Sequence, residues 1–321
     1  MFKVAVVGPI HEEGMRLFRE RKDVEVNVVK DLSPQGIAEG VRGVDAITIR
    51  TQLLPKEILA EAPDLRIVSR HGVGFDNVDV PYLTSRKIPM AITVDANYTA
   101  VAEHALMMML FLAKDVFNGD KAVRSGDFAW RNKSTLTELM DKTVLVMGYG
   151  RIGRRVAALC AAFGMKVFAY DPFVAESGMD GVTMVKDYKA LLPELDYLTV
   201  HMPAMKETVG LIGAAELAAM KKTAFVVNVA RGGIIDEDAL ADALAKGVIA
   251  GAGADVFVDE PNKPEHPLFA QQRTVFSPHN AALTAECAIR MAKQCAQNVL
   301  DCLDGGLQAR VVVNAKDIGL K

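Results

Sequence analysis

The sequence has few of the features that mark secreted, metal-binding and membrane-spanning proteins. It holds four cysteines in 321 residues, with no Cys-x-x-Cys pair and no histidine at zinc-finger spacing. Its longest apolar stretch, Ala105 to Ala113, is nine residues long, and a bilayer-crossing helix needs roughly 18. We therefore expect no structural disulfide, no metal site and no transmembrane helix.

An excess of charge of one sign is also missing. The chain carries 37 Lys and Arg against 40 Asp and Glu, scattered along its length, for a formal net charge of −3. No basic face suited to nucleic-acid phosphates is visible, and Phe2 to Val7 begins as a strand, without the regions of a secretory signal. These features predict a cytoplasmic protein whose partner is a small molecule, not a nucleic acid or a membrane.

Short Val- and Ile-rich runs alternate with longer Ala-, Leu-, Glu- and Lys-rich segments, a pattern typical of parallel α/β sheets. A chain of this length also exceeds the roughly 100–200 residues of one domain. We predict an α/β protein with two doubly wound parallel-sheet domains. The expected strands are Phe2–Val7, Val24–Val28, Asp45–Ile49 and Arg66–Ser69 in the first sheet, and Thr143–Met147, Lys166–Tyr170, Tyr197–His201, Ala224–Val229, Gly251–Val256 and Thr274–Ser277 in the second.

Two long helices are expected in the sequence, one before and one after the second series of strands. Tyr98 to Lys114 is apolar on most sides, which favours burial at a domain or subunit interface. Thr284 to Leu303 has apolar residues at helical spacing, and Val311–Val313 could follow as a short strand of the first sheet. The predicted domains are a discontinuous one of residues 1–98 plus 283–321, and one of residues 99–282.

A glycine-rich loop, Gly148-Tyr149-Gly150-Arg151-Ile152-Gly153, directly follows a strand and opens a helix. In this context the three glycines permit a tight turn, close approach to a pyrophosphate and close helix packing. Asp171 ends the next strand, where it can accept hydrogen bonds from a ribose and repel a 2′-phosphate. NAD is therefore favoured over NADP, although Asp171 could instead cap the turn before Pro172.

Three side chains after later strands suit the reduction of a 2-keto acid. Arg231 can grip a carboxylate. Glu260 and His279 follow it by 29 and a further 19 residues, and a glutamate bonded to one imidazole nitrogen fixes the tautomer and favours the charged ring. The other nitrogen can then donate a proton to the substrate oxygen, while a nicotinamide supplies the hydride.

Together these motifs resemble the D-isomer-specific 2-hydroxyacid dehydrogenase family over nearly the whole chain, closest to its short D-3-phosphoglycerate dehydrogenase-like members. The matching segments are Gly148–Gly153 with Asp171, His201-Met202-Pro203, Asn228–Gly233, Asp255 to Pro261 and Ser277–Ala282. The resemblance implies a Rossmann NAD-binding domain and a smaller flavodoxin-like substrate domain.

The resemblance also implies residue roles and an assembly. Arg231 would bind the substrate carboxylate, Glu260 would partner His279, and His279 would donate the proton in reduction and accept it in oxidation. Other positions implied to lie at the cofactor are Arg151, Ile152, His201, Met202, Pro203, Val229, Ala230 and Asp255. A homodimer is expected, with contacts from the nucleotide domain and the Tyr98–Lys114 region.

On the substrate side, the loop from Arg70 to Asp76 resembles the family loop whose N–H groups cradle the substrate carboxylate, with His71, Val73 and Gly74 at its centre. It could also be a turn that needs positive φ. Arg50 and Arg70 resemble phosphate-facing arginines of D-3-phosphoglycerate dehydrogenases, which makes 3-phosphoglycerate a candidate substrate. Both could instead be solvated surface residues.

Two alternatives remain. A glyoxylate or hydroxypyruvate reductase would use the same three residues, and a non-enzymatic NAD-binding module of the corepressor type would share the fold. A formate dehydrogenase is disfavoured because that group has glutamine at the position of Glu260. A panel of 2-keto acids with NADH would separate these possibilities.

Overall fold

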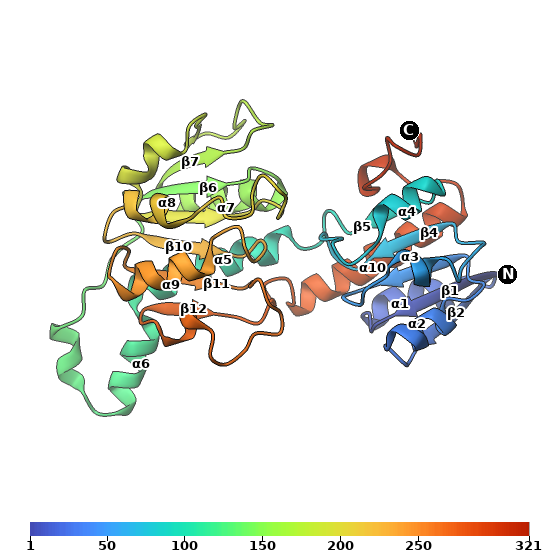
Figure 1. Ribbon diagram of the computed structural model, residues 1–321, viewed down its shortest axis with the longest axis horizontal. Coiled ribbons are helices and arrows are strands. Elements are labelled where there is room, and N and C mark those ends of the chain that lie inside the picture. The colour runs from blue at the N-terminus through green and yellow to red at the C-terminus, as the bar shows by residue number, and fades with distance from the viewer. Residues whose placement is uncertain (321) are drawn as a thin grey trace. The chain divides into compact units, whose positions relative to one another are not determined.

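The structure is a computed structural model that describes residues 1–320. Its internal contacts divide the chain into two units, one of residues 1–97 together with the residues from 283 onward, and one of residues 98–282 (Figure 1). The first unit is thus discontinuous in sequence. Each unit is built around its own parallel sheet.

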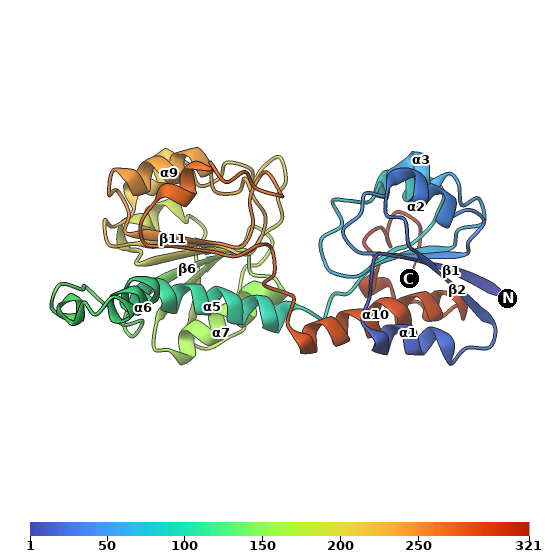
Figure 2. The same ribbon diagram turned by 90° about the horizontal axis from the view of Figure 1, so that it is seen from below.

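The sheet of the first unit has the order β2-β1-β3-β4-β5, which is the flavodoxin-like order. Alternate residues of β1 face opposite layers: Val4 and Val6 pack with α1 and α10, whereas Ala5 and Val7 pack with α2, α3 and α4. Figure 2 shows α1 and α10 on one face of this sheet and α2 and α3 on the other. The elements are β1 (Phe2–Val7), α1 (Glu12–Arg19), β2 (Val24–Val29), α2 (Pro34–Gly40), β3 (Ala46–Ile49), α3 (Lys56–Leu59), β4 (Ile67–Arg70), α4 (Val80–Ser85), β5 (Met90–Ile92), α10 (Ala285–Leu303) and η4 (Ala309–Val311).

The sheet of the second unit has the order β12-β11-β10-β9-β6-β7-β8, a Rossmann arrangement with one additional strand. Helices α5 and α7 cover one face and α9 the other (Figure 2). Helix α8 packs in the same layer as α9. The elements are α5 (Tyr98–Lys114), α6 (Val116–Arg124), η1 (Phe128–Asn132), β6 (Thr143–Met147), α7 (Arg151–Ala162), β7 (Lys166–Tyr170), β8 (Val182–Met184), η2 (Lys189–Glu194), β9 (Tyr197–Val200), α8 (Ala214–Ala219), β10 (Phe225–Asn228), α9 (Glu237–Ala245), β11 (Gly251–Ala254), η3 (Pro267–Ala270) and β12 (Thr274–Phe276).

The predicted α/β class with two parallel sheets is confirmed, and the ten expected strands lie within about two residues of their predicted bounds. The predicted strand Val311–Val313 is wrong. Only Val312 forms an isolated antiparallel bridge, with Ala91. The Asn314 side chain accepts the Met90 N–H at 3.0 Å, and Val313 N–H donates to the Met90 carbonyl at 2.8 Å. Because single residues already bond to the backbone groups at the edge of β5 in this way, residues 311–313 do not form a continuous β-ladder with that strand.

The cysteines and the longest helices add two observations. All four cysteines are free thiols, and Cys160, Cys287 and Cys295 are buried. Burial raises the pKa of the Cys160 and Cys295 thiols to about 12, so they remain protonated at neutral pH. Within residues 1–320, no helix combines the length and hydrophobicity needed to cross a membrane.

The contact between α1 and α10 generates a stability prediction. A Cβ at Gly14 would lie 2.6 Å from the carbonyl oxygen of Ala292. Gly14→Ala should lower the free energy of unfolding by about 1–3 kcal/mol through overpacking, although alanine is the better helix former by about 1 kcal/mol. Thermal unfolding followed by circular dichroism measures the change. Gly306→Ala is the control, because a Cβ there meets its nearest atom at 3.8 Å; equal melting temperatures for both variants would contradict the prediction.

Candidate active site

The second unit gathers its chemistry-bearing residues at one edge of its sheet. Every strand pair in this sheet is parallel, so all strands end on the same side, where open α/β sheets bind ligands. The residues at or just beyond these ends are Gly148 after β6, Asp171 after β7, His201 after β9, Arg231 after β10, Asp255 after β11 and His279 after β12.

The glycine loop between β6 and α7 has the shape of an anion cradle. Gly148 has φ +90°, and a Cβ there would lie 2.7 Å from the backbone of His201. A Cβ at Gly153 would lie 1.9 Å from the Gly148 carbonyl, so only glycine lets α7 begin this close to the strand. In contrast, a Cβ at Gly150 would meet no atom of residues 1–320 within 4 Å. That open side, next to the first N–H groups of α7 at Arg151 and Ile152, fits a pyrophosphate.

Asp171 links the glycine loop to the end of β7. One carboxylate oxygen accepts the Tyr149 N–H and the other accepts the Phe173 N–H, both at 2.9 Å. Asp171 therefore does cap the turn before Pro172. Because each carboxylate oxygen has two lone pairs, the same group can also accept ribose hydroxyls.

His201 lies partly buried beside the glycine loop, as a neutral ring. Its Nε2 lies 2.9 Å from Thr199 Oγ1, and its buried Nδ1 has no hydrogen-bond partner among the described residues. Desolvation lowers the pKa of His201 to about 3. Met202 is buried next to it, and Pro203 is exposed.

Glu260 and His279 form the central contact of the site. Glu260 Oε2 lies 2.7 Å from His279 Nδ1, and Glu260 Oε1 accepts the Phe257 N–H at 3.0 Å. The bond at Nδ1 leaves Nε2 as the nitrogen that can serve a substrate. The two side chains are 36% and 49% exposed, so the pair is accessible to a small molecule.

Asp255 holds the backbone on which His279 sits. Its carboxylate accepts the N–H groups of Asn280 and Ala281 at 2.9 and 3.0 Å, and its carbonyl accepts the His279 N–H at 2.8 Å. These bonds fix His279 at φ +50°, a conformation that costs a non-glycine residue free energy. Asp255, which is 1% exposed, therefore positions the imidazole in addition to any contact with a cofactor.

Sequence reasoning missed two members of this network. Ser277 Oγ donates to Asp255 Oδ1 at 2.5 Å, and His104 Nε2 lies 2.8 Å from the same hydroxyl. Desolvation lowers the pKa of His104, and the Asp255 carboxylate partly opposes this. His104 comes from α5, more than 150 residues away in the chain, so no local pattern could reveal the contact.

The loop that carries Arg231 lies against the loop that carries Glu260. Asn228 fixes the first loop from its own strand end, with bonds to Ala230 N–H at 3.0 Å and to the Arg231 carbonyl at 2.8 Å. A Cβ at Gly232 would lie 2.0 Å from the Phe257 backbone carbon. The guanidinium of Arg231 donates to the Ala230 carbonyl at 2.7 Å, and Val229 is buried.

In the first unit, Arg50 follows β3 and Arg70 ends β4. Arg70 Nη1 donates to the His71 carbonyl at 2.9 Å, and a Cβ at Gly72, which has φ +143°, would lie 1.3 Å from that nitrogen. Arg70 therefore packs under its own loop and supports it. His71 is 5% exposed. Burial first, and then the charges of Arg50 and Arg70, lower the pKa of His71 to about 4. Val73 and Gly74, at the tip of the loop, are half-buried.

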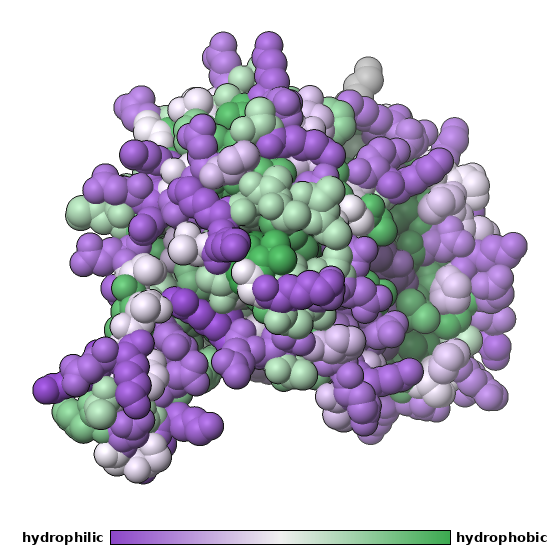
Figure 3. Space-filling view, turned by 60° about the vertical axis from the view of Figure 1, so that its left-hand side comes forward, coloured by the Kyte–Doolittle hydropathy of each residue, from purple (hydrophilic) through white to green (hydrophobic). Residues whose placement is uncertain are grey.

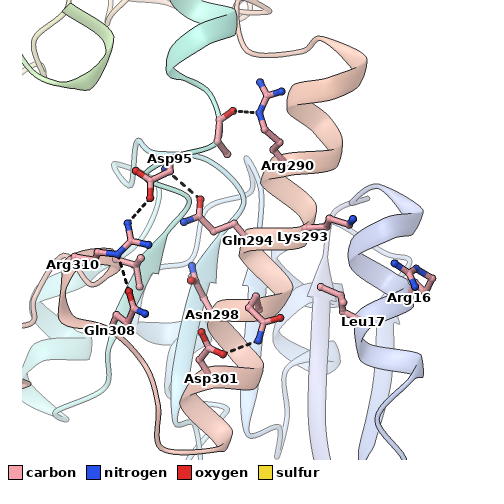
Figure 4. Close-up of a pocket in the computed structure, with 13 residues that line it drawn as sticks. Arg16, Leu17, Asp95, Arg290, Lys293, Gln294, Asn298, Asp301, Gln308 and Arg310 are labelled. Atoms are coloured by element: carbon pink, nitrogen blue, oxygen red, sulfur yellow. Dashed lines mark hydrogen bonds and ion pairs between the residues drawn. The ribbon is translucent and has the colours of Figure 1, made fainter. Parts of the chain in front are cut away.

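A separate groove of about 550 Å³ lies in the first unit, along α10. Figure 4 shows the Arg310 side chain between Asp95 and Gln308, and Arg290 at the carbonyl of the residue after Asp95. Arg16 and Lys293 both contact Glu13, at 3.2 and 3.3 Å. These cations already have partners within the chain, so the groove is largely neutralised by its own residues.

Comparisons with known proteins agree with this geometry. Residues 106–281 match the family described as D-isomer specific 2-hydroxyacid dehydrogenase, NAD binding domain. The chain is 38% identical to the D-3-phosphoglycerate dehydrogenase of Archaeoglobus fulgidus over 98% of its own length and 60% of that protein, so it spans less than two thirds of that relative. It is 36% identical to the glyoxylate reductase of Thermofilum pendens over 97% of its own length and 94% of that protein. A crystal structure of D-lactate dehydrogenase from Aquifex aeolicus, complexed with NAD and lactic acid, superposes with a TM-score of 0.84 at 26% identity, covering 97% of this chain and 98% of that one.

Two histidines with lowered pKa values predict how stability depends on pH. An unfolded histidine has a pKa of about 6.5, whereas His71 and His201 have lowered values of about 4 and about 3. Below pH 6.5 the unfolded chain therefore binds protons that the folded chain does not, and the free energy of unfolding falls toward pH 4. His201→Asn should make this fall shallower in urea unfolding measured between pH 7.5 and 4.5. The exposed His11, replaced by Asn, is the control, and an unchanged slope for His201→Asn would reject the assignment.

Proposed function

This chain belongs to the D-isomer specific 2-hydroxyacid dehydrogenase family, and we propose that it interconverts a small D-2-hydroxy acid and its 2-keto acid with NAD. The observation that carries the proposal is the 2.7 Å contact between Glu260 and His279. It lies at the same sheet edge as the glycine loop, so an acid–base pair and a dinucleotide cradle occur in one unit.

His279 is the proposed proton carrier. Its Nδ1–H donates to Glu260, which fixes the ring orientation and stabilises the imidazolium. In reduction, Nε2 of the charged ring donates a proton to the carbonyl oxygen of the keto acid, and in oxidation the neutral ring removes the hydroxyl proton. When bound, the nicotinamide carries the hydride.

Arg231 is the proposed anion clamp. A guanidinium presents paired donors that suit a carboxylate, and its charge also favours negative charge developing on the neighbouring carbonyl oxygen. The bonds from Asn228 that fix its loop support a preset orientation.

The residues that would hold NAD follow the fold. The N–H groups at the start of α7, at Arg151 and Ile152, would face the pyrophosphate, and Asp171 would accept the ribose hydroxyls. Other residues proposed to line the cofactor site are Gly148, Gly150, Gly153, His201, Met202, Pro203, Val229, Ala230 and Asp255.

Two substrate classes are supported by different observations. Arg50 at the end of β3 favours a phosphorylated substrate such as 3-phosphoglycerate, in line with the Archaeoglobus relative. The near-complete coverage of the Thermofilum glyoxylate reductase favours glyoxylate or hydroxypyruvate as the alternative. The loop from Arg70 to Gly74 would cradle the substrate carboxylate in either case.

We also propose a cytoplasmic homodimer. Helix α6 and η1 project from the second unit (Figure 1) and carry exposed apolar side chains: Phe117 is 57%, Val123 65% and Phe128 69% exposed. Figure 3 views the side from which this segment projects, where hydrophobic patches lie among hydrophilic side chains. Apolar surface of this kind favours a protein partner, and α6 continues almost directly from α5, the helix expected at the subunit contact.

His279→Ala tests the proton-transfer role. Removing a general acid–base group should lower kcat by about 10²–10⁴-fold, while the dissociation constant for NADH changes little because the glycine loop is untouched. Steady-state kinetics with glyoxylate and hydroxypyruvate, together with fluorescence titration of NADH, measure both quantities. Unchanged turnover would remove His279 from the mechanism.

Arg50→Ala tests the phosphorylated substrate. Loss of one charged hydrogen bond to a phosphate should raise KM for 3-phosphoglycerate by about 10- to 100-fold, with a much smaller effect on D-glycerate. Arg42→Ala is the matched control, since Arg42 is an exposed arginine that pairs with Glu61. Equal losses for the two substrates would reject 3-phosphoglycerate and favour the glyoxylate reductase alternative.

A further inference from the structure

The loop that carries Glu260 leaves the sheet at the end of β11 and returns through η3 to β12. Glu260 is more than a third exposed, so burial of its own side chain does not fix it. The position of its carboxylate must therefore come from the loop backbone and from what holds that backbone.

One carboxylate outside the loop contacts both of its arms. Glu237, in the first turn of α9, accepts the Val258 N–H with Oε1 at 2.7 Å. Its Oε2 lies 3.0 Å from Nε2 of His266, on the returning arm. The start of α9 is itself fixed, because Asp236 caps it through the Ala239 N–H at 3.0 Å. Glu237 thus joins residues 258 and 266 to a capped helix.

The tautomer of His266 decides which group donates the hydrogen bond in its contact with Glu237. Its Nδ1 accepts the Leu268 N–H at 3.3 Å, so Nδ1 carries no proton and Nε2–H is the donor to Glu237. The Glu237 and His266 side chains are 13% and 17% exposed. This pair is therefore drier than the Glu260–His279 pair, and its hydrogen bonds are harder for water to replace.

The two carboxylates meet the loop at successive backbone N–H groups on either side of Phe257. Phe257 N–H donates to Glu260, and the next N–H, of Val258, donates to Glu237. Gly232 packs directly on the Phe257–Val258 peptide. The Phe257 ring contacts His266 and Phe269, at centroid distances of 5.8 and 5.7 Å. A shift of the Phe257–Val258 peptide would displace Phe257, and with it the N–H on the adjoining peptide that bonds to Glu260.

We propose that Glu237, through Val258 and His266, is a positioning residue that sets the orientation of Glu260 toward His279. This inference rests on the proposed function of the Glu260–His279 pair. Without Glu237, Glu260 would spend less time bonded to Nδ1, so the imidazolium would be less stabilised. In the oxidation direction, where the neutral ring is the active form, the acid limb of the pH–rate profile should then move to lower pH.

The first test compares Glu237→Ala and Glu237→Gln with Asp238→Asn, a control that alters an exposed acidic residue in the same helical turn. The full-length protein is assayed for oxidation of D-glycerate with NAD from pH 5 to 10. We expect Glu237→Ala to move the acid limb to lower pH by at least about 0.5 pH unit. A shift of this size requires only a modest loss in the stabilisation of the charged His279 ring. Asp238→Asn should leave the limb in place.

A second set of variants separates positioning from general loss of stability. His266→Gln keeps an N–H donor for Glu237, whereas His266→Leu removes it. We expect His266→Leu to move the acid limb as Glu237→Ala does, with His266→Gln closer to the wild type. A falling melting temperature with an unmoved limb in Glu237→Ala and His266→Leu would overturn the proposal.

Glu260→Gln is the reference variant, because it separates a failure of the positioning role of Glu237 from a failure of the proposed function of the Glu260–His279 pair. If Glu260→Gln moves the limb and the Glu237 and His266 variants do not, the positioning role is rejected and the proposed function stands. If Glu260→Gln itself leaves the limb in place, the proposed function of the pair fails.

Hydrogen exchange of the peptide covering residues 255–266 gives a readout without catalysis. The exchange should quicken in Glu237→Ala but not in Asp238→Asn, and unchanged exchange in Glu237→Ala also counts against the proposal.

Discussion

The bond between Glu260 Oε2 and His279 Nδ1, 2.7 Å long, is the interaction on which the proposed chemistry depends. A histidine that moves protons needs one nitrogen held and the other available, and a carboxylate at Nδ1 provides both conditions. Neither side chain is deeply buried, so the bond must be maintained by the backbone beneath it. Much of the second unit can be understood as the support of two loops that follow the adjacent parallel strands β11 and β12.

That support comes from polar groups directed at the backbone. Asp255 holds the turn around His279 with its carboxylate and its carbonyl, and Ser277 and His104 occupy the space beside it. Glu237 bonds to the loop of Glu260 from the other side of the sheet, where α9 packs. Buried hydrogen bonds of this kind contribute individually about 1 kcal/mol, yet they decide which geometry the exposed pair adopts.

The first unit uses its strand ends differently. Arg70 turns its guanidinium under the loop it precedes, and Gly72 leaves the room for it. His71 stays neutral because it is buried close to two cations. Arg70 is therefore a support of the proposed substrate loop as well as a candidate for anion recognition. Within residues 1–320 the Arg50 side chain makes no such bond to its own loop, so Arg50 is the simpler probe of substrate charge.

The sequence by itself determined the class of fold, ten of the twelve strands of the described residues and the residue types at the strand ends, because hydrophobic periodicity and glycine spacing are local properties. It also brought Glu260 and His279 together as a pair, since both follow strands of one expected sheet. Only the tertiary structure decided what fixes that pair. His104 and Glu237 come from other helices of the chain, and a hydrogen bond between separate segments produces no periodic pattern in the sequence. The same reason explains the wrong strand at Val311–Val313, whose apolar run fits a strand locally, while Asn314 satisfies the sheet edge instead.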